Sequence, residues 1–175
     1  WHLPPQVATL AEVAGPDEVA TPTEVNDCFA AVRAAHPTAL IGVNYLRDLT
    51  CIELLPSDAD ILWTDYGAST DRSSTEHARC VRERVALQKR LDADPSWKRP
   101  LHFGAFAFLK NGETPPSDAE LPSAAAMAQA LLDVPTSSGP STGVSIDAER
   151  AAQLRSAIGE EGCLAIASGI SEQNC

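Results

Sequence analysis

The chain has little positive charge, few aromatic side chains and no long apolar run. Its 175 residues include 13 Lys and Arg against 24 Asp and Glu, which gives a net charge of -11. Such a charge repels a phosphate backbone, so no nucleic-acid partner is expected. No segment approaches the roughly 20 apolar residues that span a bilayer, and the first residues lack the pattern of a secretory signal. The sequence therefore predicts a cytoplasmic protein without a membrane partner.

Several motifs that carry chemistry are also missing. The five cysteines, at positions 28, 51, 80, 163 and 175, form no CxxC pair and are odd in number. This excludes a zinc cage or a complete disulfide framework and predicts reduced thiols. HExxH, GxxxxGK[ST] and GxGxxG are absent, which argues against metalloproteases and nucleotide triphosphatases. We expect neither a metal nor a cofactor.

Five short apolar runs rich in β-branched or aromatic residues predict buried strands. They cover residues 39–46, 59–67, 101–109, 131–138 and 163–170. Most are apolar nearly throughout, which is typical of parallel strands covered on both faces. Because the runs alternate with helical segments, the sequence predicts a barrel or a doubly wound sheet. We treat residues 1–175 as one α/β domain with an irregular segment over 1–20.

Capping signals mark the starts of three helices. The capping box of Thr21 and Glu24 begins the first helix, and Ser74 begins the second. Asp147 begins the third helix and Gly159 ends it. The apolar residues expected to face inward are Val25, Phe29 and Val32 in the first helix, Ala78, Val81, Val85 and Leu91 in the second, and Ala151, Leu154 and Ile158 in the third. A shorter alanine-rich helix is expected over 123–130.

Two loops rich in serine, threonine and glycine follow the last two predicted strands. They cover residues 136–143 and 167–174. Such loops can turn N–H groups and hydroxyls toward an anion, because glycine permits close approach and a following helix start carries partial positive charge. Ordinary turns have the same composition, so both interpretations stay open. Neighbouring parallel strands end about 5 Å apart, so the two loops can form one pocket.

Polar residues near the ends of two other predicted strands are candidate catalytic groups. Asn44 and Asp65 interrupt apolar runs, and a buried polar group at a strand end must be hydrogen-bonded or functional. Asp65 could act as a general base or bind a ligand hydroxyl, and the alternative is that it caps its own loop. Asn44 could hold a substrate hydroxyl. His102, inside a predicted strand, is expected to be a core or sheet-face histidine.

Five sequence segments, taken in order, resemble the BtpA-like group of (β/α)8 barrel proteins. They are IGVNYL, ILWTDYGAS, HFGAFAF, DVPTSSGPSTGVSIDAERAAQLRSAI and LAIASGISEQN. The last segment is more distantly similar to the phosphate-binding end of phosphoribosylanthranilate isomerase. The resemblance covers residues 40–174 and is most specific in TSSGPSTG, with its capped helix, and in ASGIS.

This resemblance implies a TIM-type barrel that binds a phosphate or a similar anion with its βα loops. The residues placed to meet the anion are Ser137, Ser138, Gly139, Thr142, Gly143, Ser168 and Gly169. A full barrel has eight strands, whereas about five to six parallel strands are recognisable, so we expect an incomplete barrel with two open edges. A second copy of the chain is one way to cover them.

Two functions are open at this point. The first is a protein that binds a small phosphorylated ligand, as an enzyme acting on a sugar phosphate or nucleotide or as its inactive relative. In that function Asp65 is the acid/base candidate. The second is a non-catalytic assembly or scaffold protein of the BtpA-like type, or a truncated barrel without independent activity. The resemblance does not decide whether the chain is an enzyme.

Overall fold

The chain forms one five-stranded parallel sheet in which the strands lie in chain order. A computed structural model describes residues 21–44, 51–67, 71, 74–108, 115–141 and 143–172. The strands are β1 (Gly42–Asn44), β2 (Ile61–Gly67), β3 (Leu101–Ala105), β4 (Val134–Ser138) and β5 (Ala165–Ala167). Each pairs in parallel with the next along the chain. The predicted α/β class with a parallel sheet is therefore confirmed.

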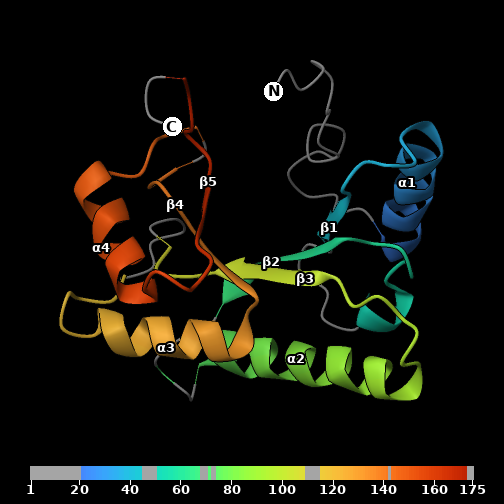
Figure 1. The fold of residues 1–175 in the computed structure, drawn as a ribbon, viewed down its shortest axis with the longest axis horizontal. Coiled ribbons are helices and arrows are strands. Elements are labelled where there is room, and N and C mark those ends of the chain that lie inside the picture. Colours follow the sequence, from blue (N-terminus) through green and yellow to red (C-terminus); the bar gives the residue numbers. More distant parts are fainter. Residues whose placement is uncertain are drawn as a thin grey trace.

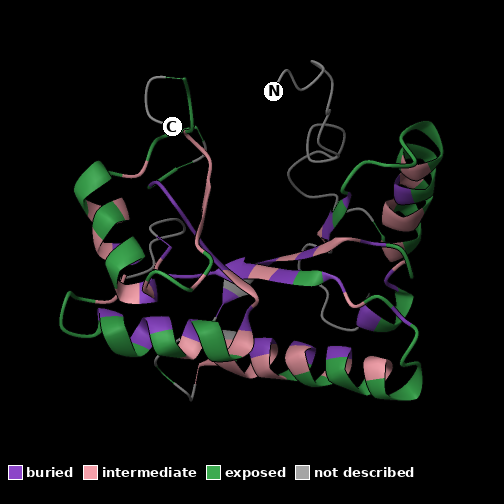
Figure 2. Ribbon diagram, in the orientation of Figure 1, coloured by how far each residue is buried: buried purple, intermediate pink, exposed green. Residues whose placement is uncertain are grey.

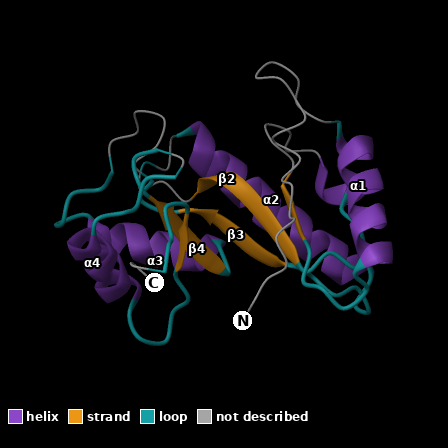
Figure 3. Cartoon of the chain, turned by 90° about the horizontal axis from the view of Figure 1, so that it is seen from above, coloured by secondary structure: helices purple, strands orange, loops and turns teal. Residues whose placement is uncertain are grey.

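Helices connect the strands and cover the sheet. They are α1 (Pro22–Ala35), α2 (Thr75–Ala93), α3 (Leu121–Leu131) and α4 (Ala148–Ile158), with a 3-10 helix η2 (Cys51–Leu54) ahead of β2. Figure 1 shows α2 and α3 along one face of the sheet, with α1 and α4 at its two ends. The view from above in Figure 3 agrees, with the strands lying over α2. None of the described helices has both the length and the apolar character needed to cross a membrane.

Side-chain caps begin three helices where the sequence predicted them. Thr21 and Glu24 form a complete capping box at α1, with the Glu24 carboxylate accepting the Thr21 amide at 2.8 Å. Ser74 accepts an amide of α2, and Asp147 accepts two amides of α4. The prediction that β4 begins at residue 131 was wrong, because α3 continues to Leu131 and the strand begins at Val134.

Among the described residues, the core consists of two apolar clusters on the helix side of the sheet. Figure 2 shows buried residues on the sides of α2 and α3 that face the strands. The first cluster is built around Phe29, Leu62 and Leu87, and joins α1 and the first half of the sheet to the end of α2. The second is built around Phe106 and Leu154, and joins α3 and α4 to the second half. Helix α2 contributes to both.

A buried polar layer separates these clusters. It consists of Thr64 on β2, His102 on β3 and Glu83 on α2, all nearly inaccessible to solvent. The Nε2 atom of His102 lies 3.1 Å from the Thr64 hydroxyl and 3.4 Å from a Glu83 carboxylate oxygen. On α2, Glu83 lies between Cys80 of the second cluster and Leu87 of the first. The prediction of a core histidine at position 102 is confirmed.

The structure corrects two of the predicted inward-facing residues. Val85 was expected to face the core, but 47% of it is exposed, and the buried face of α2 is Cys80, Glu83 and Leu87. An inward glutamate was not expected from composition, because a carboxylate is buried only beside a partner such as His102. Val32 of α1 is 39% exposed, since α1 packs mainly through Phe29.

Candidate functional site

The candidate site lies where β4 and β5 end, at the carboxyl edge of the sheet. These strands pair in register, with Ser138 opposite Ala167. The chain leaves β4 into the loop that leads to α4, and it leaves β5 at Ser168. Because the two strands are parallel neighbours, both exits emerge at the same edge. In open α/β sheets, ligands bind at this edge.

Two hydrogen bonds join the exits. The Gly143 amide donates to the Ser168 hydroxyl at 2.7 Å, and the Ser145 hydroxyl donates to the Gly169 carbonyl at 2.7 Å. A hydroxyl that accepts one bond still carries its own proton, so Ser168 retains a donor. The two serine- and glycine-rich loops thus form one continuous rim. Ser145 was missed by the sequence analysis, although it belongs to the same polar run.

The glycines of this rim are required by backbone geometry. A Cβ on Gly139 would overlap the Val144 carbonyl oxygen, and a Cβ on Gly169 would overlap the main chain of Val144 and Ser145. Gly169 has φ 70°, in the left-handed region that favours glycine. Close packing of the two loops therefore explains why Gly139 and Gly169 are present, and the sequence had interpreted both glycines as part of an anion site.

The hydroxyls of β4 and the start of α4 are engaged within the protein. Ser137 donates to the Ala107 carbonyl at 3.4 Å, and Ser138 donates to the Gly139 carbonyl at 3.2 Å; both side chains are buried. The Asp147 carboxylate accepts the amides of Glu149 and Arg150. The start of α4 was expected to offer positive charge to an anion, but a carboxylate already occupies it. Any anion at this rim is left to the loop amides and hydroxyls.

The other candidate residues lie apart from this rim or outside the described structure. Asn44 is the last residue of β1, so β2 and β3 lie between it and β4. At about 4.8 Å per strand this is a separation of about 14 Å across the sheet. Asp65 belongs to β2, but its side chain lies outside the described part of the structure, as does all of Thr142. The structure thus brings the loops together and leaves Asn44 on another strand of the same edge.

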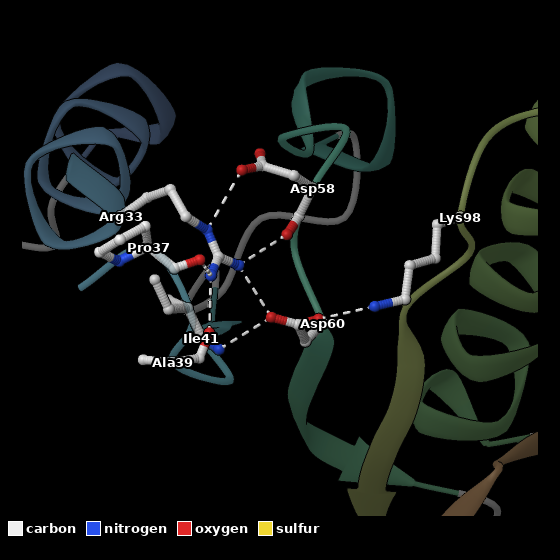
Figure 4. A network of polar contacts seen from close by, with 7 residues as sticks. All are labelled: Arg33, Pro37, Ala39, Ile41, Asp58, Asp60 and Lys98. Atoms are coloured by element: carbon white, nitrogen blue, oxygen red, sulfur yellow. Dashed lines mark hydrogen bonds and ion pairs between the residues drawn. The ribbon is translucent and has the colours of Figure 1, made fainter.

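The amino edge of the sheet holds carboxylates that tie the strands together. Asp60, just before β2, accepts Lys98 at 2.9 Å, Arg33 at 2.8 Å and the Ile41 amide at 3.1 Å (Figure 4). The hydrogen bond from Lys98, followed by those from Arg33 and Ile41, lowers the pKa of Asp60 well below its usual range. The carboxylate therefore stays ionised and links the starts of β1, β2 and β3.

Asp133, just before β4, has the same arrangement. It accepts Arg99 through two hydrogen bonds of 2.6 and 2.8 Å, Arg84 at 3.1 Å and the His102 amide at 2.8 Å. Burial alone would raise the pKa of Asp133, but the bonds from Arg99 and His102 outweigh it and lower the pKa to about 2. These ion pairs hold the starts of β3 and β4 to helix α2 at the amino edge of the sheet.

The structural roles of Asp60 and Asp133 were not predicted from the sequence. A readable signal existed, because acids immediately precede β2 and β4 while two basic residues, Lys98 and Arg99, precede the strand between them. Opposite charges that start neighbouring parallel strands meet at one edge. Among the described residues, no group of three or more His, Cys, Asp and Glu side chains is arranged to hold a metal ion.

Comparison with family models, with curated proteins and with solved structures finds no match to this chain in any of the three.

Proposed function

We propose that the chain binds a small phosphorylated ligand at the rim formed by the ends of β4 and β5. The observation that carries this proposal is the contact between the two loops, in which Gly143 and Gly169 have left-handed backbones and Ser168 accepts a loop amide. Loops of this kind present amides and hydroxyls toward an anion. The resemblance to phosphate-binding (β/α)8 barrels also supports it. On this proposal the sheet is part of an incomplete TIM-type barrel.

The proposed donors are neutral groups. The start of α4 is occupied by Asp147, and the Ser145 hydroxyl donates its proton to the Gly169 carbonyl, so the loop amides and the Ser168 hydroxyl must hold the phosphate. A chain with a net charge of -11 does not collect anions through its overall field. Measured phosphate binding would therefore report a local site. An enzymatic role on a sugar phosphate or nucleotide, with Asp65 as acid/base, extends this proposal.

A pair of substitutions at Gly143 tests the site. A Cβ at this residue meets no atom within 4 Å, and its φ is 81°. Asn and Asp tolerate this backbone better than other residues and differ mainly in charge. Gly143→Asp should weaken phosphate or ribose 5-phosphate binding about tenfold more than Gly143→Asn, because a like charge beside the anion is unfavourable. Calorimetry and amide NMR shifts measure both.

Binding that is equal in the two variants, or no binding by the unmodified protein, would contradict the phosphate site. Ser168→Ala provides a second measurement, since it removes only a hydroxyl. It should reduce affinity while thermal unfolding shows that the protein remains folded.

A second function is favoured by the other face of the sheet. Leu62 and His102 point toward α2, so Trp63 and Phe103, the next residues along their strands, point away from the helices. The Trp63 and Phe103 rings stack with centroids 6.1 Å apart, and Leu101 on the same face is 50% exposed. This apolar strip supports the assembly alternative, in which a second copy of the chain covers the open sheet.

Light scattering tests the assembly alternative. If this face mediates association, Leu101→Lys should convert a dimer into a monomer. Leu54→Lys in η2 is the matched control, because Leu54 is 54% exposed and lies away from the strip. A monomeric unmodified protein would contradict the alternative, and so would equal effects of the two substitutions.

A further inference from the structure

A groove of about 630 Å³ lies at the amino edge of the sheet, opposite the proposed phosphate site. Its walls come from the connections that precede β1, β2 and β3, over residues 37–40, 57–60 and 94–98, together with Arg33 of α1. Small-molecule sites commonly occupy about 300–1,000 Å³. The groove thus has the size of a ligand site and belongs to a different part of the molecule.

Four side chains in this groove form a row of alternating charge (Figure 4). The Asp58 carboxylate lies 3.2 Å from Arg33 Nε, Arg33 Nη2 lies 2.8 Å from Asp60, and Asp60 lies 2.9 Å from Lys98 Nζ. The order is therefore negative, positive, negative, positive. Each charge is fixed by the next, and the four side chains come from helix α1 and from the connections that precede β2 and β3.

The two inner charged groups also bind main-chain groups. The Arg33 guanidinium also donates to three main-chain carbonyls, and Asp60 also accepts a main-chain amide. Their side chains are 21% and 12% exposed, whereas Asp58 is 57% exposed and Lys98 is 75% exposed. The row therefore presents one accessible carboxylate and one accessible ammonium, each held from behind by a less exposed partner.

The remaining lining is largely apolar near the mouth. Leu40 is 79% exposed, and Pro37 and Ala39 continue this wall. Trp97 also lines the groove, and its buried indole N–H has no hydrogen-bond partner among the described residues. The groove thus combines an apolar wall with exposed charges of both signs, which are the carboxylates of Asp58 and Asp94 and the ammonium of Lys98.

We propose that this groove binds a small zwitterion of the free amino-acid class, with its ammonium at Asp58 and its carboxylate at Lys98. A simple cation would meet repulsion from Lys98, and a simple anion would meet repulsion from Asp58, whereas a zwitterion pairs with both. An apolar portion of the ligand would pack on Leu40. Because both protein charges are solvated, the expected Kd is about 1 mM.

Titration of the ¹⁵N-labelled protein with leucine and with 6-aminohexanoate tests this proposal. The two ligands differ in the spacing of their charges, so the tighter one reports the separation that the groove accepts. Amide shifts are expected at residues 57–60 and 96–98. The N-acetylated and the carboxamide forms of the tighter ligand, which each lack one charge, should bind about tenfold more weakly.

Matched substitutions test whether the ligand binds in this groove. Lys98→Met and Asp58→Asn should each weaken binding about tenfold. Lys89→Met and Asp27→Asn, at exposed helix positions, should leave it unchanged. Thermal unfolding shows whether each variant is folded. If Lys98→Met does not fold, the binding measured with Asp58→Asn is used instead, because that variant keeps the ion pair between Arg33 and Asp60. Absence of shifts with both amino acids, equal binding of the blocked forms, or unchanged affinity in the groove variants would overturn the proposal. Phosphate binding at the other edge is measured separately and does not depend on this result.

Discussion

Gly143 and Ser168 join two loops that are 25 residues apart in the sequence, through a 2.7 Å hydrogen bond from the Gly143 amide to the Ser168 hydroxyl. The bond connects the β4–α4 loop directly to the end of β5. Around it, Gly139 and Gly169 allow main chains to approach more closely than any side chain permits. The rim is therefore a packed structural unit, and its integrity can be measured separately from ligand binding.

Alanine at Gly169 should destabilise the protein more than alanine at Gly143. Both residues have positive φ, but only Gly169 faces the main chain of Val144 and Ser145, where a Cβ would overlap. We expect Gly169→Ala to lower the free energy of unfolding by about 3 kcal/mol, and Gly143→Ala by about 1 kcal/mol. Urea unfolding measures both values. Equal losses would show that loop packing is not the reason for Gly169.

Acid should remove the stabilisation provided by Asp133. Its pKa is about 2 in the folded protein against an ordinary value of 3.8. The contribution is therefore present above about pH 4 and is lost as the pH falls through about 2, amounting to about 2 kcal/mol. Asp133→Asn should lower the free energy of unfolding at pH 7 and flatten its dependence between these pH values. Asp118→Asn, which removes an exposed carboxylate paired with Arg150, should change stability by less than about 0.5 kcal/mol. An unchanged pH dependence in Asp133→Asn would contradict this assignment.

Replacing one member of the buried polar layer should lower the free energy of unfolding more than replacing both Glu83 and His102 by apolar residues. Replacing His102 with Ala leaves the buried Glu83 carboxylate without its histidine partner, at a cost of about 3 kcal/mol. The double substitution Glu83→Met and His102→Leu replaces the pair by apolar groups, and should restore stability to within about 1 kcal/mol of the unmodified protein. Chemical denaturation of the single and double variants tests the coupling. Additive losses would show that the two residues act independently.

Thiol reactivity should distinguish the described cysteines. Burial, with the neighbouring Glu83 charge, raises the pKa of Cys80 to about 12, whereas Cys163 is exposed. Because the thiolate is the reactive form, iodoacetamide should label Cys163 in the folded protein and label Cys80 only after unfolding. Peptide mass spectrometry identifies the labelled residues. Early labelling of Cys80 would indicate opening of the cluster around Phe106.

The sequence was informative where local chemistry determines structure. Caps at Thr21, Ser74 and Asp147 act on amides within a few residues, so helix starts were predicted correctly. The strands were recognised by their apolar runs, and their parallel arrangement followed from alternation with helices. Their limits were less accurate, because an apolar residue such as Leu131 suits the end of a helix as well as the start of a strand.

Features that depend on contacts distant in sequence were not predicted. Glu83 faces the core because His102, on another element, meets its carboxylate, and no local pattern on α2 reveals this. The candidate loops were found from their composition, but the packing that explains Gly139 and Gly169 needed the spatial contact with Val144 and Ser145. The amino-edge carboxylates were not predicted, because their partners Arg33 and Arg84 lie on helices that are distant in the sequence.

The chain-order sheet has a consequence for how the protein forms. In the described part of the chain, each of β2 to β5 pairs with the strand that precedes it, so none of these strands must wait for a partner made much later. During synthesis the amino-terminal units can associate first, and each later helix and strand adds to an edge that already exists. Assembly can therefore proceed stepwise along the polypeptide, in the order in which the ribosome releases it.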